Sequence, residues 1–183
     1  SGRVWFLPSS RWALQVSAGR LNETEPGHDG DPPIDINRVT ASVTYHRMTM
    51  NDTIWASTIG WGRNAEREGD ATNALVAESS VTARAKLAWY GRFEWAEKSD
   101  HDLVVPEPGI FNVAKLQAGY TRYLGAWQGF TPGIGATVST GIVPRALESA
   151  YGSRFNTGFG LYLTLRPAAM KVSVRSWYAA RGA

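Results

Sequence analysis

Leu87-Ala88-Trp89-Tyr90-Gly91-Arg92-Phe93-Glu94-Trp95-Ala96 is the stretch in which the alternation of side chains is clearest. In an extended strand, successive side chains point to opposite faces. One face therefore carries Leu87, Trp89, Gly91, Phe93 and Trp95. The other carries Ala88, Tyr90, Arg92, Glu94 and Ala96, so both charges lie on the same side. This pattern predicts a β-strand with one apolar and one polar face.

The same alternation recurs along the whole chain, and helical periodicity is nearly absent. The predicted strands cover residues 11–21, 35–46, 53–63, 72–82, 85–98, 112–123, 130–143 and 154–166. Long or intermediate links (22–34, 64–71, 99–111, 144–153) alternate with short ones (47–52, 83–84, 124–129). Long links at one end and short turns at the other favour an antiparallel up-and-down sheet of about eight strands.

Length and composition exclude several classes of protein. The 183 residues suit one domain, or one large piece of a bigger one. We expect a β-barrel domain over 1–166 and a tail over 167–183, either a weak further strand or disordered. No apolar run reaches the roughly 18 residues of a transmembrane helix. The absence of cysteine excludes disulfides and thiolate sites. The net charge of +3 comes from basic residues scattered along the chain, so it gives little support to nucleic-acid binding.

The polar face is unusual because it is rich in small residues and its few charges are of mixed sign. A water-exposed sheet surface usually carries many Lys, Glu and Arg side chains. Small residues instead suit a crowded or water-lined interior, in which opposite charges pair across strands. The predicted lining residues of that interior are Glu78, Tyr90, Arg92, Glu94, Lys115 and Gln117. They could form a structural ion-pair network or a pore lining that selects by charge.

Aromatic residues gather towards the strand ends of the apolar face. An outer-membrane barrel carries such residues at both membrane interfaces, around a band that faces lipid. The predicted interfacial aromatics are Trp12, Tyr45, Trp55, Trp61, Trp89, Trp95, Tyr120 and Phe155. The alternative is that they form the ordinary core of a soluble β-protein.

Three stretches carry a resemblance to a known family: Thr72–Ser79, Ala114–Tyr120 and the strand Phe159-x-Leu161-x-Leu163-x-Leu165. They resemble the C-terminal part of porin-like outer-membrane β-barrels of Gram-negative bacteria. The resemblance implies a transmembrane β-barrel, closed alone or part of a larger one. It also implies contact with the lipid bilayer, lipopolysaccharide and the outer-membrane assembly machinery. It supplies no substrate, and the tail after Leu165 departs from the family, whose members usually end on the last strand.

No residue constellation predicts an enzyme, a cofactor or a metal site. His46 lies four residues from Ser42 on the polar face, which is opposite to the face used by outer-membrane lipid hydrolases. The clusters His28-Asp29-Gly30-Asp31 and Asp100-His101-Asp102 match no zinc or EF-hand spacing. We therefore expect porin-like passive passage of small polar solutes or ions. A non-conducting structural or adhesive membrane barrel and a soluble barrel that binds an apolar ligand are the alternatives.

Overall fold

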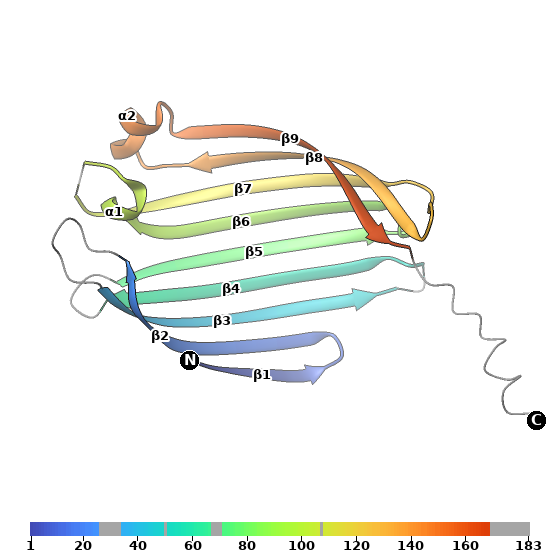
Figure 1. Ribbon diagram of the computed structural model, residues 1–183, viewed down its shortest axis with the longest axis horizontal. Coiled ribbons are helices and arrows are strands. Elements are labelled where there is room, and N and C mark those ends of the chain that lie inside the picture. The colour runs from blue at the N-terminus through green and yellow to red at the C-terminus, as the bar shows by residue number, and fades with distance from the viewer. Residues whose placement is uncertain (26–33, 50, 67–70, 107, 169–183) are drawn as a thin grey trace, which may run out of the picture.

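Nine antiparallel strands form one sheet in which each strand pairs with its neighbours in the sequence (Figure 1). The computed structural model describes residues 1–25, 34–49, 51–66, 71–106 and 108–168. The strands are β1 Gly2–Ser9, β2 Trp12–Glu25, β3 Ile34–Met48, β4 Ile54–Glu66, β5 Ala71–Ala83, β6 Leu87–Ser99, β7 Ile110–Tyr123, β8 Phe130–Ile142 and β9 Phe155–Pro167. The predicted antiparallel up-and-down order is confirmed.

The predicted number of strands is wrong by one. All eight expected strands are present as β2 to β9, and β1 precedes them. Strand β1 pairs with β2 but lacks clean alternation, because Trp5 falls on the polar face opposite Gln15. Its hydrophobic run Val4-Trp5-Phe6-Leu7 is therefore not a period-2 pattern.

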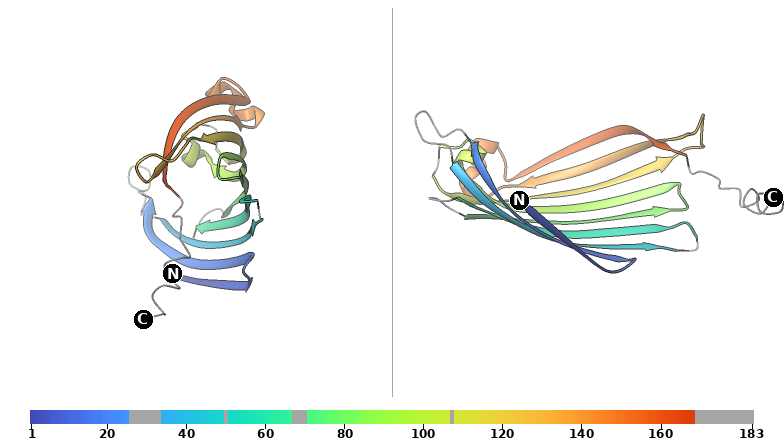
Figure 2. Two further views of the ribbon diagram at one scale, coloured as in Figure 1. Left: turned by 90° about the vertical axis from the view of Figure 1, so that its right-hand side faces the viewer. Right: turned by 60° about the horizontal axis from the view of Figure 1, so that its bottom comes forward.

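The sheet is strongly curled but not closed (Figure 2). The central strands lie on one side of the curl, and the two edge strands, β1 and β9, lie on the opposite, open side. The sequence left open whether these strands close alone or belong to a larger barrel; in the described residues they do not close, and β1 and β9 are free edges.

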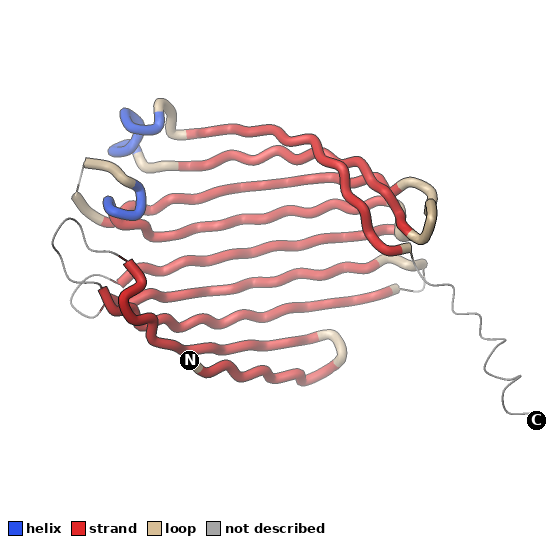
Figure 3. The backbone as a smooth tube through the Cα atoms, in the orientation of Figure 1, coloured by secondary structure: helices blue, strands red, loops and turns tan. Residues whose placement is uncertain are grey.

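Two ends of the sheet differ in their connections (Figure 3). At the long-link end, residues after β6 form helix α1 (Asp100–Leu103), and residues after β8 form η1 (Arg145–Leu147) and α2 (Glu148–Tyr151). At the opposite, short-link end, residues 49–53, 84–86 and 124–129 join the strands. This arrangement agrees with the alternation of link lengths along the sequence.

The exposure of the two faces is the reverse of that in a water-soluble sheet. On β9, Leu161 and Leu163 are 87% and 84% exposed, whereas Tyr162 and Thr164 between them are half-buried. On the neighbouring strands, the polar-face residues Thr121, Gly133 and Gly135 are buried. The polar face therefore lies inside the curl, and the apolar face lies outside it.

Few apolar side chains are buried in the described part of the chain. They are Ile36, Val143 and Leu147, and only Leu147 is fully buried. Val143 and Leu147 belong to the long-link end, where Leu147 donates its backbone N–H to Pro144 O at 3.0 Å. The sheet itself thus holds no dry apolar core, and its backbone ladder joins the strands.

The predicted tail lies almost wholly outside the described residues. Pro167 ends β9, and Ala168 donates its backbone N–H to Gly129 O at 2.8 Å. Among the described helices, none is long and apolar enough to cross a bilayer.

Candidate functional site: the centre of the polar face

The six predicted lining residues come together in the middle of β5, β6 and β7. Arg92 of β6 lies directly between Glu78 of β5 and Gln117 of β7. Two residues further along β6, Glu94 pairs in register with Lys115 of β7. Because alternate residues share a face, these side chains all point to the inside of the curl.

Arg92 is the hub of the charged cluster. Its Nη1 contacts Glu78 Oε2 at 3.2 Å, and its Nε donates to Glu94 Oε1. The three side chains remain 40 to 46% exposed. Ion pairs that accessible to water contribute little to stability, because water screens them and their side chains lose entropy. Their clearer effect is to hold charged groups at defined positions on a wet surface.

Lys115 takes no part in this ion-pair network. Although it faces Glu94 in the register, no salt bridge joins it to a carboxylate among the described residues. The expected pairing of carboxylates with Arg92 is present, whereas that with Lys115 is not. The polar face therefore presents one ammonium group available to solutes.

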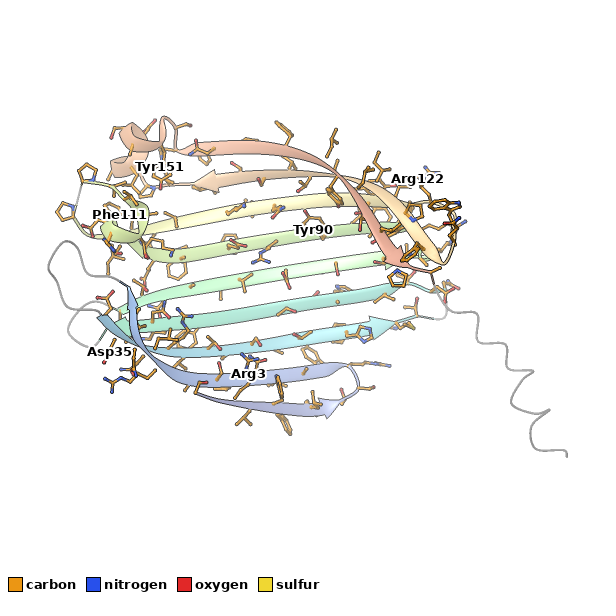
Figure 4. The ribbon with its side chains drawn as sticks, in the orientation of Figure 1. Arg3, Asp35, Tyr90, Phe111, Arg122 and Tyr151 are labelled. Atoms are coloured by element: carbon orange, nitrogen blue, oxygen red, sulfur yellow. The ribbon has the colours of Figure 1, made fainter. Side chains whose placement is uncertain are left out.

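Tyr90, labelled on β6 in Figure 4, anchors a hydrogen-bond cluster beside these charges. Its hydroxyl donates to Thr137 Oγ1 at 3.0 Å and accepts from Gln117 Nε2 at 3.1 Å. To reach Thr137 of β8 from β6, the ring crosses β7 at Gly119. A Cβ at position 119 would lie 2.2 Å from Tyr90 Cε1, so glycine is required there.

The same arrangement occurs a second time, between β9 and β7. Tyr162 crosses β8 over Gly135, where a Cβ would lie 2.3 Å from the ring Cζ. The Tyr162 hydroxyl is 2.7 Å from Oγ1 of the buried Thr121. Sequence reasoning missed both tyrosine–glycine pairs, because the partners lie 27 to 29 residues apart and only the register aligns them. The abundance of glycine on the polar face was the one feature of the sequence that indicated close packing of large side chains there.

Two hollows flank Arg92 on the polar face. One of about 400 Å³ is lined by residues that include Thr58, Glu78, Tyr90 and Gln117. The other, of about 410 Å³, includes Gln15, Thr40 and Glu94 together with apolar residues such as Leu75 and Trp95. Carboxylate, guanidinium, amide and hydroxyl groups thus surround spaces large enough for small polar solutes. These groups can bind and orient small polar molecules.

Five of the predicted interfacial aromatics gather at the short-link end of the apolar face. Trp12 and Tyr45 have ring centroids 4.8 Å apart, and Tyr45 and Trp55 5.5 Å apart. Trp89 and Tyr120 form a further pair at 5.6 Å. The ladder continues from Trp55 through Val81 to Trp89, so the aromatics follow one another across the sheet.

The indole N–H of Trp55 has hydrogen-bond acceptors on the apolar face. Its Nε1 lies 2.9 Å from Ser57 Oγ and 3.0 Å from Ser79 Oγ, and the two hydroxyls are 2.8 Å apart. This cluster lets two serines occupy an apolar surface with their hydroxyls paired.

The other three aromatics occupy a second row, nearer the long-link end. Trp61 and Trp95 both face Leu75 in the register, and Phe155 faces Ile142. Two residues beyond Trp61 and Trp95 on the same face lie Arg63 and Glu97. The apolar surface of these strands therefore ends in polar groups.

Charged or polar residues also bound the apolar surface of β3 and β7 at both ends. On β3, Asn37 and Arg47 enclose a run of apolar outer positions, and on β7, Asn112 and Arg122 do so. Each pair is ten positions apart. These boundaries were not part of the sequence prediction, and the register shows that they lie on the apolar face.

The remaining candidate sites gain no support from the geometry. No hydrogen bond joins His46 to Ser42 among the described side chains. Asp100 and Asp102 belong to α1, in which Asp102 pairs with Lys98 at 3.2 Å. The cluster at 28–31 lies outside the described residues, and within them no group of three His, Asp or Glu residues could hold a metal ion.

Comparison with protein-family models, with curated proteins and with solved structures found no match to this chain.

Proposed function

We propose that this sheet belongs to an outer-membrane-type β-barrel, whose polar face lines a water-filled passage for small polar solutes or ions. The apolar face would contact lipid, and Glu78, Arg92, Glu94 and Lys115 would bias passage by charge. The resemblance of the sequence to porin-like proteins adds the location, the outer membrane of a Gram-negative bacterium. Lipopolysaccharide and the outer-membrane assembly machinery are the partners that this location implies.

One observation carries the proposal: the large apolar side chains are the exposed ones. Leu161 and Leu163 are more than four-fifths exposed, whereas Thr121 is only 6% exposed. In water, so much apolar surface would carry a large hydrophobic cost, which lipid contact removes. A soluble barrel that binds an apolar ligand requires the opposite arrangement, with leucines inside.

The length of the apolar surface fits a bilayer. Ten residues of strand extend roughly 33 Å, and at a tilt of about 40° they span about 25 Å along the membrane normal. This is the separation between Arg47 and Asn37 on β3 and between Arg122 and Asn112 on β7. The two aromatic rows are closer, six positions or about 15 Å vertically, so at least one row lies within the hydrocarbon band.

Strand direction limits how such a barrel closes. In an up-and-down sheet of nine strands, β1 and β9 run in the same direction. Antiparallel pairing between them is therefore impossible, and closure requires an odd number of further strands. An even total is the rule for single-chain bacterial outer-membrane barrels. We accordingly propose that these nine strands form part of a larger barrel.

Single-channel recording tests the proposal. The full chain, folded in uncharged detergent and inserted into planar bilayers, should give stepwise conductance that protein-free detergent does not. Stable insertion without current would favour the non-conducting membrane barrel instead. Failure to enter vesicles, with high solubility in detergent-free buffer, would reject both membrane hypotheses.

A further inference from the structure

A hollow at the short-link end gathers positive charge away from the polar-face centre. It has a volume of about 860 Å³ and lies between residues 51–53, the β5–β6 turn and the end of β7. Arg84, Lys86 and Arg122 all line it, together with the neutral polar residues Asn51 and Thr53. The proposed passage of solutes does not account for this cluster.

The three cations lack compensating charge. No carboxylate is among the residues that line the hollow, although Asp52 lies in the adjoining link. No ion pair or hydrogen bond engages the side chains of Arg84, Lys86 or Arg122 within the described part of the chain. Like charges around one solvent-filled space repel one another, so a bound anion would lower the electrostatic energy.

The backbone that presents these cations is well anchored. In the β5–β6 turn, Lys86 donates its backbone N–H to Ala83 O at 3.0 Å, and both turn residues, Arg84 and Ala85, have positive φ. The turn is tied to β7 by the hydrogen bond from Tyr123 N–H to Lys86 O, at 2.7 Å. The backbone positions from which these charged side chains extend are therefore fixed relative to one another.

A fourth cation stabilises the rim. Arg166 of β9 places its guanidinium carbon 3.6 Å from the ring centroid of Tyr123, a lining residue. Its Nη2 donates to Ala85 O at 2.5 Å. Arg166 thus braces the turn and adds positive charge next to the hollow, although it does not line it.

From this geometry we infer that the short-link hollow is a binding site for phosphate-bearing anions. Guanidinium groups match phosphate oxygens with paired N–H donors, and an ammonium group adds a point charge. A volume of this size accepts a pyrophosphate-sized group or the headgroup of an anionic phospholipid. The shared chemistry is the phosphate, and the two sources are distinguished by experiment.

Isothermal titration calorimetry with inorganic pyrophosphate tests the site on the full chain, folded in uncharged detergent. The variant R84N/K86Q/R122Q removes the three cations, with Asn at 84 because Asn tolerates positive φ. The matched control R3Q/R38Q/R63Q removes the same charge from other parts of the sheet. We expect at least tenfold weaker binding in the first variant and less than twofold in the control. Binding should also weaken as salt rises.

Three results would overturn the inference: no pyrophosphate binding by the unchanged chain, equal losses in both variants, or an unaltered affinity in R84N/K86Q/R122Q. Far-UV circular dichroism checks that both variants keep their β-structure. Should the hollow variant unfold, the single variant K86Q replaces it, with R38Q as its control, and the same three results would overturn the inference.

A second arm identifies the source of the phosphate. Micelles doped with phosphatidylglycerol should displace pyrophosphate if a lipid headgroup is the ligand, whereas phosphatidylcholine-doped micelles should not. Displacement by neither lipid assigns the site to soluble phosphates. These binding measurements do not depend on channel conductance, so their outcome is independent of whether the protein passes solutes.

Discussion

Tyr90 lies flat across Gly119, with the position of a Cβ at residue 119 only 2.2 Å from the tyrosine ring. The contact joins β6 to β7 and lets the hydroxyl reach Thr137 on β8. It links three strands on a face that has no apolar core. The absence of a side chain at Gly119 is therefore a packing requirement, and it can be tested directly.

Gly119→Ala should destabilise the protein by about 1–3 kcal/mol, the usual cost of overpacking. The matched control is Gly91→Ala on the opposite face, where a Cβ would meet nothing within 4 Å. That change should be neutral or mildly stabilising, since glycine inside a strand is unfavourable. Urea unfolding followed by circular dichroism measures both. Equal effects of the two substitutions would contradict the close packing of Tyr90.

Tyr162→Phe should cost about 1–3 kcal/mol, because it leaves the buried Thr121 hydroxyl without its partner. Tyr151→Phe is the control, since Tyr151 is exposed in α2 and its hydroxyl makes no hydrogen bond among the described residues. The unfolding midpoint reports the difference. A midpoint shared by Tyr162→Phe and the unchanged protein would show that Thr121 is satisfied by water instead.

Leu163→Arg and Thr164→Arg separate lipid contact from water contact on adjacent residues of β9. If the apolar face meets lipid, Arg at 163 should cost about 2–4 kcal/mol near the bilayer midplane. Arg at 164 faces the polar side and should cost much less. Folding into vesicles across a urea series measures both values. A soluble protein predicts the reverse, because Leu163 is already 84% exposed and Thr164 is sheltered.

Arg92→Gln should shift ion selectivity towards cations, because Glu78 and Glu94 then lose their shared positive partner. The reversal potential in a salt gradient measures the shift. Arg63→Gln removes the same charge from the apolar face and should leave the potential unchanged. A similar shift in both variants would mean that overall charge, and not the polar-face centre, determines selectivity.

Local alternation was sufficient to predict most of the sheet. Residues such as Trp89 and Arg92 belong to opposite faces whatever their partners are, because the side-chain period of a strand is two. The strand β1 was missed for the same reason: Trp5 breaks the alternation, and only its pairing with β2 makes it a strand. The pairing of Glu78 and Glu94 with Arg92 was also expected, since neighbouring strands of an up-and-down sheet place their middles side by side.

Features that depend on register could not be predicted in this way. Whether Arg92 or Lys115 pairs with Glu94 depends on how far each side chain reaches across the twisted sheet. In the structure, the Arg92 guanidinium pairs with the carboxylates of both Glu78 and Glu94. The hollow at the short-link end joins residues from three separate links. No local pattern brings Asn51, Arg84 and Arg122 together, because they are distant in sequence and meet only through the sheet.

By itself, then, the sequence determined eight of the nine strands and which of their side chains share a face, because both follow from a repeat of two along a single segment. The tertiary structure alone decided which face lies inside the curl, that β1 and β9 are free edges within the described part of the chain, and which tyrosine covers which glycine. Those properties arise from strand pairing and sheet curvature, which involve residues far apart in the chain.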